Sequence, residues 1–410
     1  MKRITMLSVA ATVAFSTAAK AQLTMQMTNG WNFTFAGNVN AFGIYTSASV
    51  DKGCATSPCI VGGVVPEEKV SRIRTGLLPA FATFEAKGKE LGLDLAVHFG
   101  FAPQINSDGE HDNFGAQIDM RQVYLTAGGS WGQILAGREL GLYQRQNILN
   151  DATLFGAGPT GGGIGAKGTT LGRIGTGYIY PNFNAQLTYS TPASSPVALS
   201  IGLFDPSIIN SSGSTTYNVT KTPRIEAEVS YTLPFGSAAA GGKPANKALL
   251  WVSGAYQHAD SGIDTGPSVD AVGGAAGARV DIGGLGVVGS GYYAHGFGTT
   301  LMFTTSLSVD ATGKERDSYG YILQATFAIP ATSFTVGGSW GESRMMQTDA
   351  DKAIVGDPLV LANSAAIAFV NYQLTKSLKW VFEGTYAQSR AFSGAKNKSY
   401  QGTSGLMLFF

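Results

Sequence analysis

The sequence predicts an all-β protein, a transmembrane antiparallel β-barrel of about 16 strands. Only 13% of the 410 residues are charged, whereas 44% are hydrophobic and 55 are glycine; soluble domains carry roughly 25% charged residues. No run of about 20 apolar residues follows the N-terminal segment, which excludes a transmembrane helix. Apolar and polar residues instead alternate over many segments, as in strands that face lipid with every second residue.

The N-terminal segment has the features of a secretory signal peptide. The basic residues Lys2 and Arg3 precede apolar residues 4–15, a stretch too short to span a bilayer, and an Ala-x-Ala site ends at Ala21. A buried N-terminal helix is the alternative, but nothing amphipathic follows this segment. We therefore predict a signal peptide at residues 1–21, followed by a single barrel domain at residues 22–410.

Export determines how the charge and the cysteines are interpreted. Without the predicted signal peptide, 25 basic residues face 27 acidic ones, a net charge of −2 that does not indicate a nucleic-acid partner. The only cysteines, Cys54 and Cys59, have no histidine beside them, so a zinc site is not indicated. Because exported proteins mature in an oxidising compartment, we predict a disulfide between Cys54 and Cys59.

Alternation is regular in several segments. In residues 223–233 one face is apolar and includes Val229, whereas the other carries Glu228; Phe382 and Glu383 alternate in the same way. A soluble β-sandwich also alternates, but the long strands, the aromatic residues near strand ends and the charged polar faces favour the membrane barrel. We expect Val229 and Phe382 to face lipid, and Glu228 and Glu383 to face the lumen and tolerate Gln or Lys.

The same pattern predicts where each strand lies and how the strands connect. Tight turns alternate with long polar segments, as short periplasmic turns alternate with long external loops in outer-membrane barrels. An even number of strands leaves both termini on the periplasmic side, and about 16 strands enclose an aqueous channel. The predicted strands are 31–48, 70–87, 91–103, 116–128, 131–141, 173–191, 196–205, 223–235, 246–258, 274–283, 286–296, 317–329, 332–343, 361–375, 378–391 and 399–410.

Three motifs carry a family resemblance. The last strand, YQGTSGLMLFF, alternates Leu406, Leu408 and Phe410 outward and ends in phenylalanine. The hairpin RQVYLTAGGSWGQILAGRELGLY runs from an arginine-led strand through a short turn to a strand that ends in Gly-Arg. A glycine-rich segment, residues 142–172, follows directly. With these motifs the chain resembles the trimeric, sixteen-stranded general diffusion porins of Gram-negative bacteria over its whole mature length.

The resemblance implies a location, partners and a constriction. It places the chain in the outer membrane as a homotrimer, in contact with membrane lipid and lipopolysaccharide. Leu406, Leu408 and Phe410 resemble the signal that the barrel-assembly machinery recognises. Residues 142–172 occupy the place of the loop that folds into the barrel in this family and narrows the pore.

The resemblance also suggests which residues line the constriction, where basic side chains of the wall face acidic residues of the loop. Arg72, Arg74, Arg121 and Arg138 match basic positions of the wall, and Arg173 matches an arginine after the loop, in an uncertain register. Asn38 stands where some relatives have lysine. In the loop itself Asp151 is the only carboxylate. The full set of predicted constriction residues is Arg72, Arg74, Arg121, Arg138, Arg145, Asp151, Lys167 and Arg173.

The four wall arginines also have structural interpretations. Arg72 and Arg74 could bind lipopolysaccharide phosphates at the rim or pair with Glu67 and Glu68. Arg121 could pair with Asp119, and Arg138 could hold Glu139 or loop carbonyls. The glycine cluster GAGPTGGGIGAKG superficially suggests a phosphate cradle, but no Gly-Lys-Ser/Thr follows it. A flexible loop poor in side chains is the simpler interpretation.

The predicted function is passive diffusion of small hydrophilic solutes and ions, which requires no cofactor or metal. Basic side chains in a pore favour anions, and guanidinium groups bind carboxylate and phosphate, so we expect an anion preference. A channel specific for dicarboxylates or aromatic acids is the main alternative. A membrane lipase or protease needs a Ser/His or Asp/His constellation that the four scattered histidines do not provide, and a surface adhesin stays open.

Overall fold

The computed structural model describes residues 23–27, 30–49, 69–105, 118–159, 168–238, 244–262, 266–303 and 308–410. The predicted signal peptide, Cys54, Cys59 and Lys167 lie outside these residues. No helix in the described part is long and apolar enough to cross a membrane. The strands are β1 (Leu23–Gln26), β2 (Asn32–Ser49), β3 (Lys69–Arg74), β4 (Phe81–Glu90), β5 (Leu93–Pro103), β6 (Ile118–Gly129), β7 (Gly132–Leu140), β8 (Phe183–Ser190), β9 (Val197–Phe204), β10 (Ile209–Asn210), β11 (Thr216–Tyr217), β12 (Arg224–Ala238), β13 (Pro244–Asp260), β14 (Ser268–Ile282), β15 (Leu285–His295), β16 (Asp317–Ala328), β17 (Phe334–Met345), β18 (Val360–Gln373), β19 (Leu378–Ala391) and β20 (Lys396–Phe409); the helices are α1 (Arg145–Leu149), a 3₁₀ helix (Ala152–Phe155) and α2 (Asp349–Lys352).

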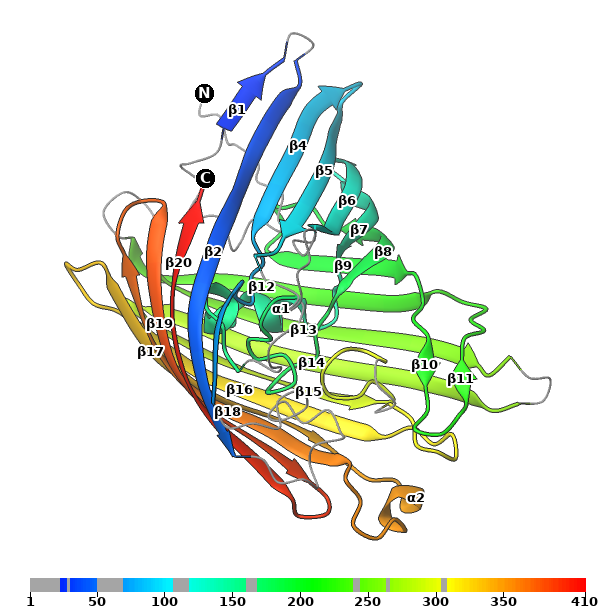
Figure 1. Ribbon diagram of the computed structural model, residues 1–410. Coiled ribbons are helices and arrows are strands. Elements are labelled where there is room, and N and C mark those ends of the chain that lie inside the picture. Colours follow the sequence, from blue (N-terminus) through cyan, green and yellow to red (C-terminus); the bar gives the residue numbers. More distant parts are fainter. Residues whose placement is uncertain are drawn as a thin grey trace.

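The strands form one closed antiparallel barrel (Figure 1). Each wall strand pairs with its neighbours in the sequence, and β2 pairs with β20, which joins the two ends of the sheet. β3 and β4 both pair with β2 and together make one interrupted wall strand, so the wall has the predicted 16 strands. Short β1 pairs with the start of β2, beyond the point where Phe410 bonds to Gly37 through N–H···O contacts of 2.8 and 3.0 Å.

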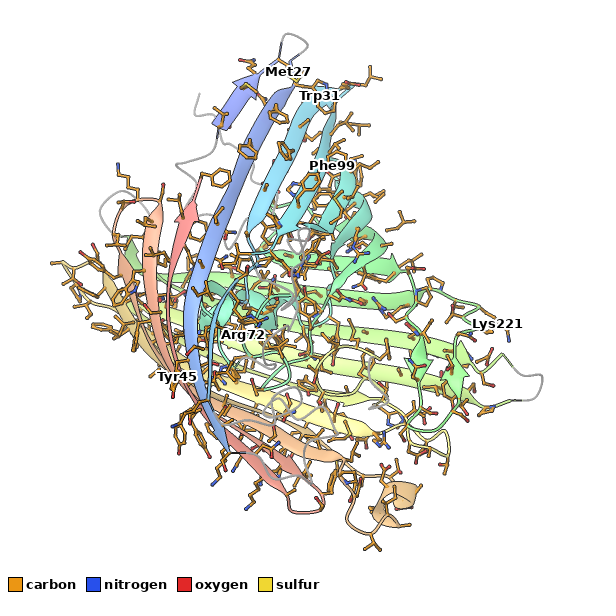
Figure 2. All side chains as sticks on the ribbon, viewed as in Figure 1. Met27, Trp31, Tyr45, Arg72, Phe99 and Lys221 are labelled. Carbon is orange, nitrogen blue, oxygen red and sulfur yellow. The ribbon has the colours of Figure 1, made fainter. Side chains whose placement is uncertain are left out.

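The two ends of the barrel differ, as predicted. β1 and the C-terminal end of β20 lie at the end that carries the short turns, whereas α2 and the β10–β11 hairpin lie at the opposite end (Figure 1). Tight turns such as those between β14 and β15 need glycine, because Gly283 and Gly284 adopt φ of +54° and +94°. Figure 2 places Trp31 near the short-turn end and Lys221 near the long-loop end.

The alternation of the sequence is realised on the two faces of the wall. Val229 and Phe382 point outward with 41% and 45% of their surface exposed, while Glu228 and Glu383 point inward and are 4% and 1% exposed. Rows of exposed apolar side chains on the outer face match what a strand presents to lipid hydrocarbon. In β20, Leu406 and Leu408 face outward and Phe409 faces inward.

The predicted strand 70–87 is interrupted at residues 75–80, a difference with a clear physical cause. Pro79 has no N–H to give to the ladder. Two buried side chains of β2 replace the missing ladder bonds: Asn40 donates to Leu78 O (2.9 Å) and accepts from Gly76 N (2.9 Å), while Asn38 donates to Pro79 O (3.2 Å). The sequence prediction missed this break, because the alternation of apolar and polar residues does not show where side chains take over the backbone hydrogen bonds of a strand.

The predicted strand 173–191 is also shorter in the structure, where β8 begins only at Phe183. Residues 173–182 instead continue the segment that precedes β8. Gly175 and Gly177 adopt φ of +76° and +148°, which a strand does not accommodate. The segment between β7 and β8 therefore spans residues 141–182, longer than the predicted 142–172, and we call it the inner loop.

Candidate functional site

The inner loop lies inside the barrel, with α1 enclosed by the wall strands (Figure 1). Its described residues are 141–159 and 168–182. Its apolar side chains, including Ile148, Leu154 and Tyr178, are buried together with Leu77 from the interruption of the second wall strand and Phe409 of β20. The loop is therefore packed onto the strands near the barrel closure.

Carboxylates of β12 fix the first part of the loop. One oxygen of Glu226 accepts the backbone N–H groups of Leu142 (2.7 Å) and Tyr143 (2.9 Å). Arg145 of α1 donates two hydrogen bonds to Glu228, at 2.7 and 3.3 Å. Such bidentate arginine–carboxylate pairs fix geometry as well as charge, so Arg145 holds the loop to the wall instead of projecting freely into the pore.

The middle of the loop is held by the opposite side of the wall. Glu383 on β19 accepts the N–H groups of Ala157 and Gly158, both at 2.9 Å, and Gln401 on β20 donates to the carbonyl of Gly158 at 2.8 Å. Gly158 has φ of +60°, and a Cβ there would meet the carbonyl oxygen of Gly172 at 2.5 Å. The two limbs of the loop thus touch at a point where only glycine fits.

Arginines fix the returning limb. Arg74 donates to the carbonyls of Gly168 and Thr169, both at 2.9 Å. Arg173 is fully buried and donates to the carbonyl of Ala365 (2.9 Å) and to the hydroxyl of Ser339 (3.1 Å). Burial lowers the pKa of Arg173 to about 10, so it stays charged at neutral pH.

Asp151, the carboxylate expected to face the arginine wall, is buried within the loop. It caps the 3₁₀ helix by accepting from Thr153 N (2.9 Å) and Thr153 Oγ1 (2.6 Å), and it also accepts from the Tyr178 hydroxyl (2.9 Å). Burial raises the pKa of Asp151, against the effect of Arg173 and of these hydrogen bonds. Asp151 therefore shapes the loop and does not lie on its open surface.

Arg121 remains on the inner face of the wall. A bulge in β6 places it beside Gln122, whose side chain also points inward. It pairs with Asp119 at 2.8 Å, as one interpretation of the sequence anticipated, and donates to the Tyr180 hydroxyl at 3.3 Å. Arg72 of β3 also faces inward. Tyr45, on the neighbouring strand β2, points to the outer face of the same wall (Figure 2).

Arg138 lies on the outer face, which corrects the expectation that it lines the constriction. It pairs across the ladder with Val123 and Ala185 on the outward side, and it alternates with Glu139, which is buried inside and accepts from Gln122 at 2.8 Å. The sequence contained an indication of this orientation. Ile134 lies four residues earlier on the same strand, so it shares a face with Arg138, and it is apolar and exposed on the outside.

Several loop contacts escaped the sequence prediction. Glu226, Glu228, Glu383 and Gln401 anchor the loop, and Lys379 lies with its Nζ 4.3 Å from the centre of the Phe155 ring. Alternation placed such residues on the inner face but could not identify their partners, which lie more than 80 positions away in the chain.

The geometry so far is that of a barrel whose third long connection folds inside and narrows the lumen. A sequence model described as Gram-negative porin matches residues 8–391. The chain belongs to the Gram-negative porin family. This confirms the resemblance seen in the sequence, and it identifies the protein as an outer-membrane channel and not an enzyme.

Solved structures are similar to the porin in fold. The outer membrane channel DcaP of Acinetobacter baumannii superposes with a TM-score of 0.67 at 14% identity, covering 94% of this chain and 99% of that one. An anion-selective porin from Comamonas acidovorans gives 0.60 at 12% identity, covering 93% and 100%. OmpF of Salmonella typhi in complex with daunomycin gives 0.55 at 12% identity, covering 95% and 100%. No curated protein sequence matches the porin.

Proposed function

We propose that the porin passes small hydrophilic solutes beside the inner loop and prefers anions. The observation that carries this proposal is an asymmetry of exposure near the loop. Five carboxylates of the wall and loop are buried, each less than 5% exposed, whereas three inward cations keep part of their surface open. The buried carboxylates are Glu139, Asp151, Glu226, Glu228 and Glu383, and the partly exposed cations are Arg72, Arg121 and Lys379.

The open surface near the loop is therefore positive on balance. Asp119, a carboxylate of this region with 43% of its side chain exposed, pairs with Arg121, so its charge is offset by that arginine. A narrow lumen responds to these local charges more than to the net charge of the chain, because screening extends over about 8 Å at physiological salt. The anion-selective porin of Comamonas acidovorans, similar in fold, supports the same preference.

Reversal potentials in a salt gradient test this proposal. The double variant Arg121→Gln, Lys379→Gln should shift the zero-current potential of planar bilayers toward cation selectivity. Arg138→Gln is the matched control, because it removes the same kind of charge from the outer face and should leave the potential unchanged. The shift should shrink at 1 M salt, where screening shortens to about 3 Å.

Two results would contradict the proposal. An unchanged potential in the double variant, with conductance intact, would show that these cations do not face the permeating ions. Saturable transport, or current block by one dicarboxylate or aromatic acid, would favour a substrate-specific channel over general diffusion.

We also propose that the porin assembles as a homotrimer, with Leu406, Leu408 and Phe410 acting as its assembly signal. Membership of a family whose solved structures include trimers supports the first part. Chemical cross-linking of the native membrane protein should give a three-chain product. Deletion of Phe410, which lies against the Phe35 ring at 5.1 Å, should sharply lower the folded protein in the membrane.

A further inference from the structure

The inner face of β13, β14 and β15 is lined by small apolar side chains. The interior of a water-filled barrel is normally polar, yet five inward residues of these three strands are alanine. Each is at most 6% exposed, so a part of the chain other than the wall covers this face. The five residues are Ala255, Ala259, Ala271, Ala275 and Ala294.

The cover includes the segment that directly follows β15, residues 296–303, which we call the second inner segment. Gly296 and Gly298 adopt φ of +74° and +79°, so the chain can turn away from the wall strand and into the barrel. Phe297 and Phe303 are 0% and 1% exposed, and their ring centroids lie 4.8 Å apart. Both rings belong to the same buried cluster as the five alanines, so this segment lies against the inner face of the wall.

The second inner segment also packs on the inner loop. Tyr180 of the inner loop donates its backbone N–H to the carbonyl of Thr300 at 2.8 Å, and it forms a β-bridge with Leu301. The ring of Tyr143, at the start of the inner loop, lies 5.3 Å from the ring of Phe297. The two segments are therefore joined by backbone hydrogen bonding and by buried aromatic contact.

The joint between the two segments borders the region where we place the solute passage. The Tyr180 hydroxyl accepts a hydrogen bond from Arg121 at 3.3 Å, and the Arg121 side chain keeps 14% of its surface exposed. The backbone of Tyr180 thus contacts the second inner segment while its side chain contacts a cation of the passage. A solute that moves along Arg121 therefore passes beside this joint.

We propose that the second inner segment is a second constriction element, which closes the β13–β15 side of the lumen together with the inner loop and sets the largest solute that can pass. This inference rests on the proposed diffusion of solutes beside the inner loop and adds the feature that limits their size. The segment stays in place because its release would expose Phe297 and Phe303 to water.

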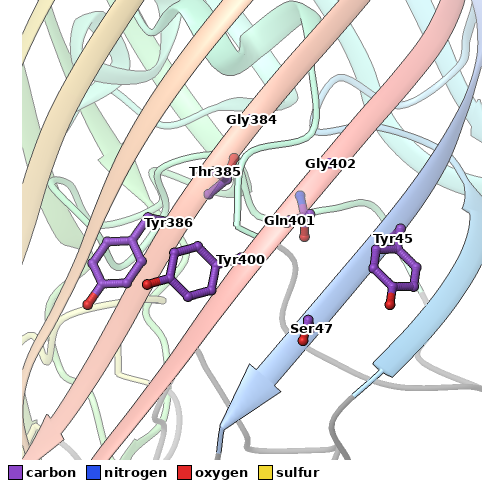
Figure 3. Close-up of a pocket in the computed structure, with 8 residues that line it drawn as sticks. All are labelled: Tyr45, Ser47, Gly384, Thr385, Tyr386, Tyr400, Gln401 and Gly402. Carbon is purple, nitrogen blue, oxygen red and sulfur yellow. The ribbon is translucent and has the colours of Figure 1, made fainter.

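The outer face offers an aromatic pair of similar spacing as a control. Tyr386 and Tyr400 have ring centroids 5.2 Å apart and, with Tyr45, line a hollow over β19, β20 and β2 (Figure 3). These two tyrosines share the outward faces of Phe382 and Leu406. Loss of a ring here removes a comparable contact without touching the lumen.

Swelling of liposomes that contain the purified porin, in glucose, sucrose or raffinose, tests the proposal together with single-channel conductance. Phe297→Ala removes the ring that joins the two segments. It should raise the conductance and increase the swelling rate in raffinose relative to glucose, because the second inner segment no longer holds its place. Tyr400→Ala is the matched control and should keep the parent conductance and the parent ratio of rates.

A cysteine pair keeps the test independent of folding defects in Phe297→Ala. The triple variant Phe297→Ala, Tyr180→Cys, Leu301→Cys places two cysteines at bridged positions, about 5 Å apart between Cα atoms and within the range of a disulfide. Oxidised during refolding, it should show the parent size limit; reduced after insertion into the membrane, it should admit raffinose faster. The parent treated with the same reductant is the control, because both proteins contain Cys54 and Cys59.

Three outcomes would overturn the proposal. They are an unchanged size limit in folded Phe297→Ala, an equal gain in Tyr400→Ala, and a triple variant that behaves alike before and after reduction. Because the sugars are neutral, these results are independent of the anion preference that reversal potentials measure. A parent porin that admits none of the sugars would contradict the proposed diffusion itself, and this inference with it.

Discussion

The two faces of β19 show how one alternating strand serves two different environments. Inward, Glu383 is 1% exposed and accepts two backbone N–H groups of the inner loop; outward, its neighbour Phe382 is 45% exposed. The inner face is buried but polar, so a substitution there destabilises the barrel when it leaves a charge or a hydrogen-bond donor without its partner. The outer face is apolar and faces lipid, so a substitution there destabilises the barrel when it introduces a charge.

The largest effect is expected where an inner ion pair is broken. Arg145→Met removes the cation that pairs with the buried carboxylate of Glu228, which then accepts a neutral hydrogen bond from Gln146 at 3.1 Å in place of an ion pair. Removing one partner of a buried ion pair costs about 3–5 kcal/mol. Urea unfolding of the refolded barrel in micelles measures this cost. Arg138→Met on the outer face is the matched control and should change the unfolding free energy far less. Equal effects of the two substitutions would contradict the assignment of the faces.

A charge added to the outer face comes next. Val229→Arg should cost about 2–4 kcal/mol if Val229 lies near the bilayer midplane, measured by unfolding in lipid vesicles. Val229→Leu should be nearly neutral because it keeps the face apolar. If Val229→Arg were harmless, Val229 would not face lipid.

A smaller effect is expected at Glu383, which the sequence alone suggested would tolerate Gln. The side chain of Glu383→Gln can still accept the N–H groups of Ala157 and Gly158 but loses the charge that strengthens these bonds, at a cost of about 1–2 kcal/mol. Open-channel current noise should rise, because the middle of the inner loop is held less firmly. Thr385→Ser, on the same inner face, should leave the noise unchanged. Quiet channels from Glu383→Gln would show that this anchor is dispensable.

The smallest effect concerns the long-loop end, outside both faces. Burial by itself raises the pKa of Asp351, but hydrogen bonds from Arg316, both at 2.6 Å, and from Thr348 outweigh it and hold the pKa below its usual value. A carboxyl with a lowered pKa stabilises the fold above its unfolded pKa of about 4 and loses that contribution as the pH falls through the folded value. Hydrogen exchange in residues 308–316 should therefore accelerate below about pH 4, while the wall strands stay protected. Asp351→Asn should abolish this pH dependence; if the dependence persisted, another group would control the loop.

The sequence by itself determined the strands and their facing, because period-two alternation is a local property of neighbouring side chains. It placed Val229, Phe382, Leu406 and Leu408 outward, and it predicted 16 wall strands with short turns at one end. The even spacing between Ile134 and Arg138 also indicated that Arg138 faces outward, because residues an even number of positions apart on a strand share a face. The position of Arg138 in the family motif suggested the pore instead.

Only the tertiary structure decided what the inward side chains do. Three arginines that the sequence suggested for the pore lining instead hold the inner loop in place. They are Arg74, Arg145 and Arg173, and their partners lie up to 192 positions away in the chain. Asp151 accepts hydrogen bonds from the 3₁₀ helix that it caps and from the Tyr178 hydroxyl. Asn38 and Asn40 replace the ladder hydrogen bonds that are missing around Pro79. Such partners meet only when the barrel closes around the loop, so no local pattern can distinguish a free cation in the lumen from an anchored one.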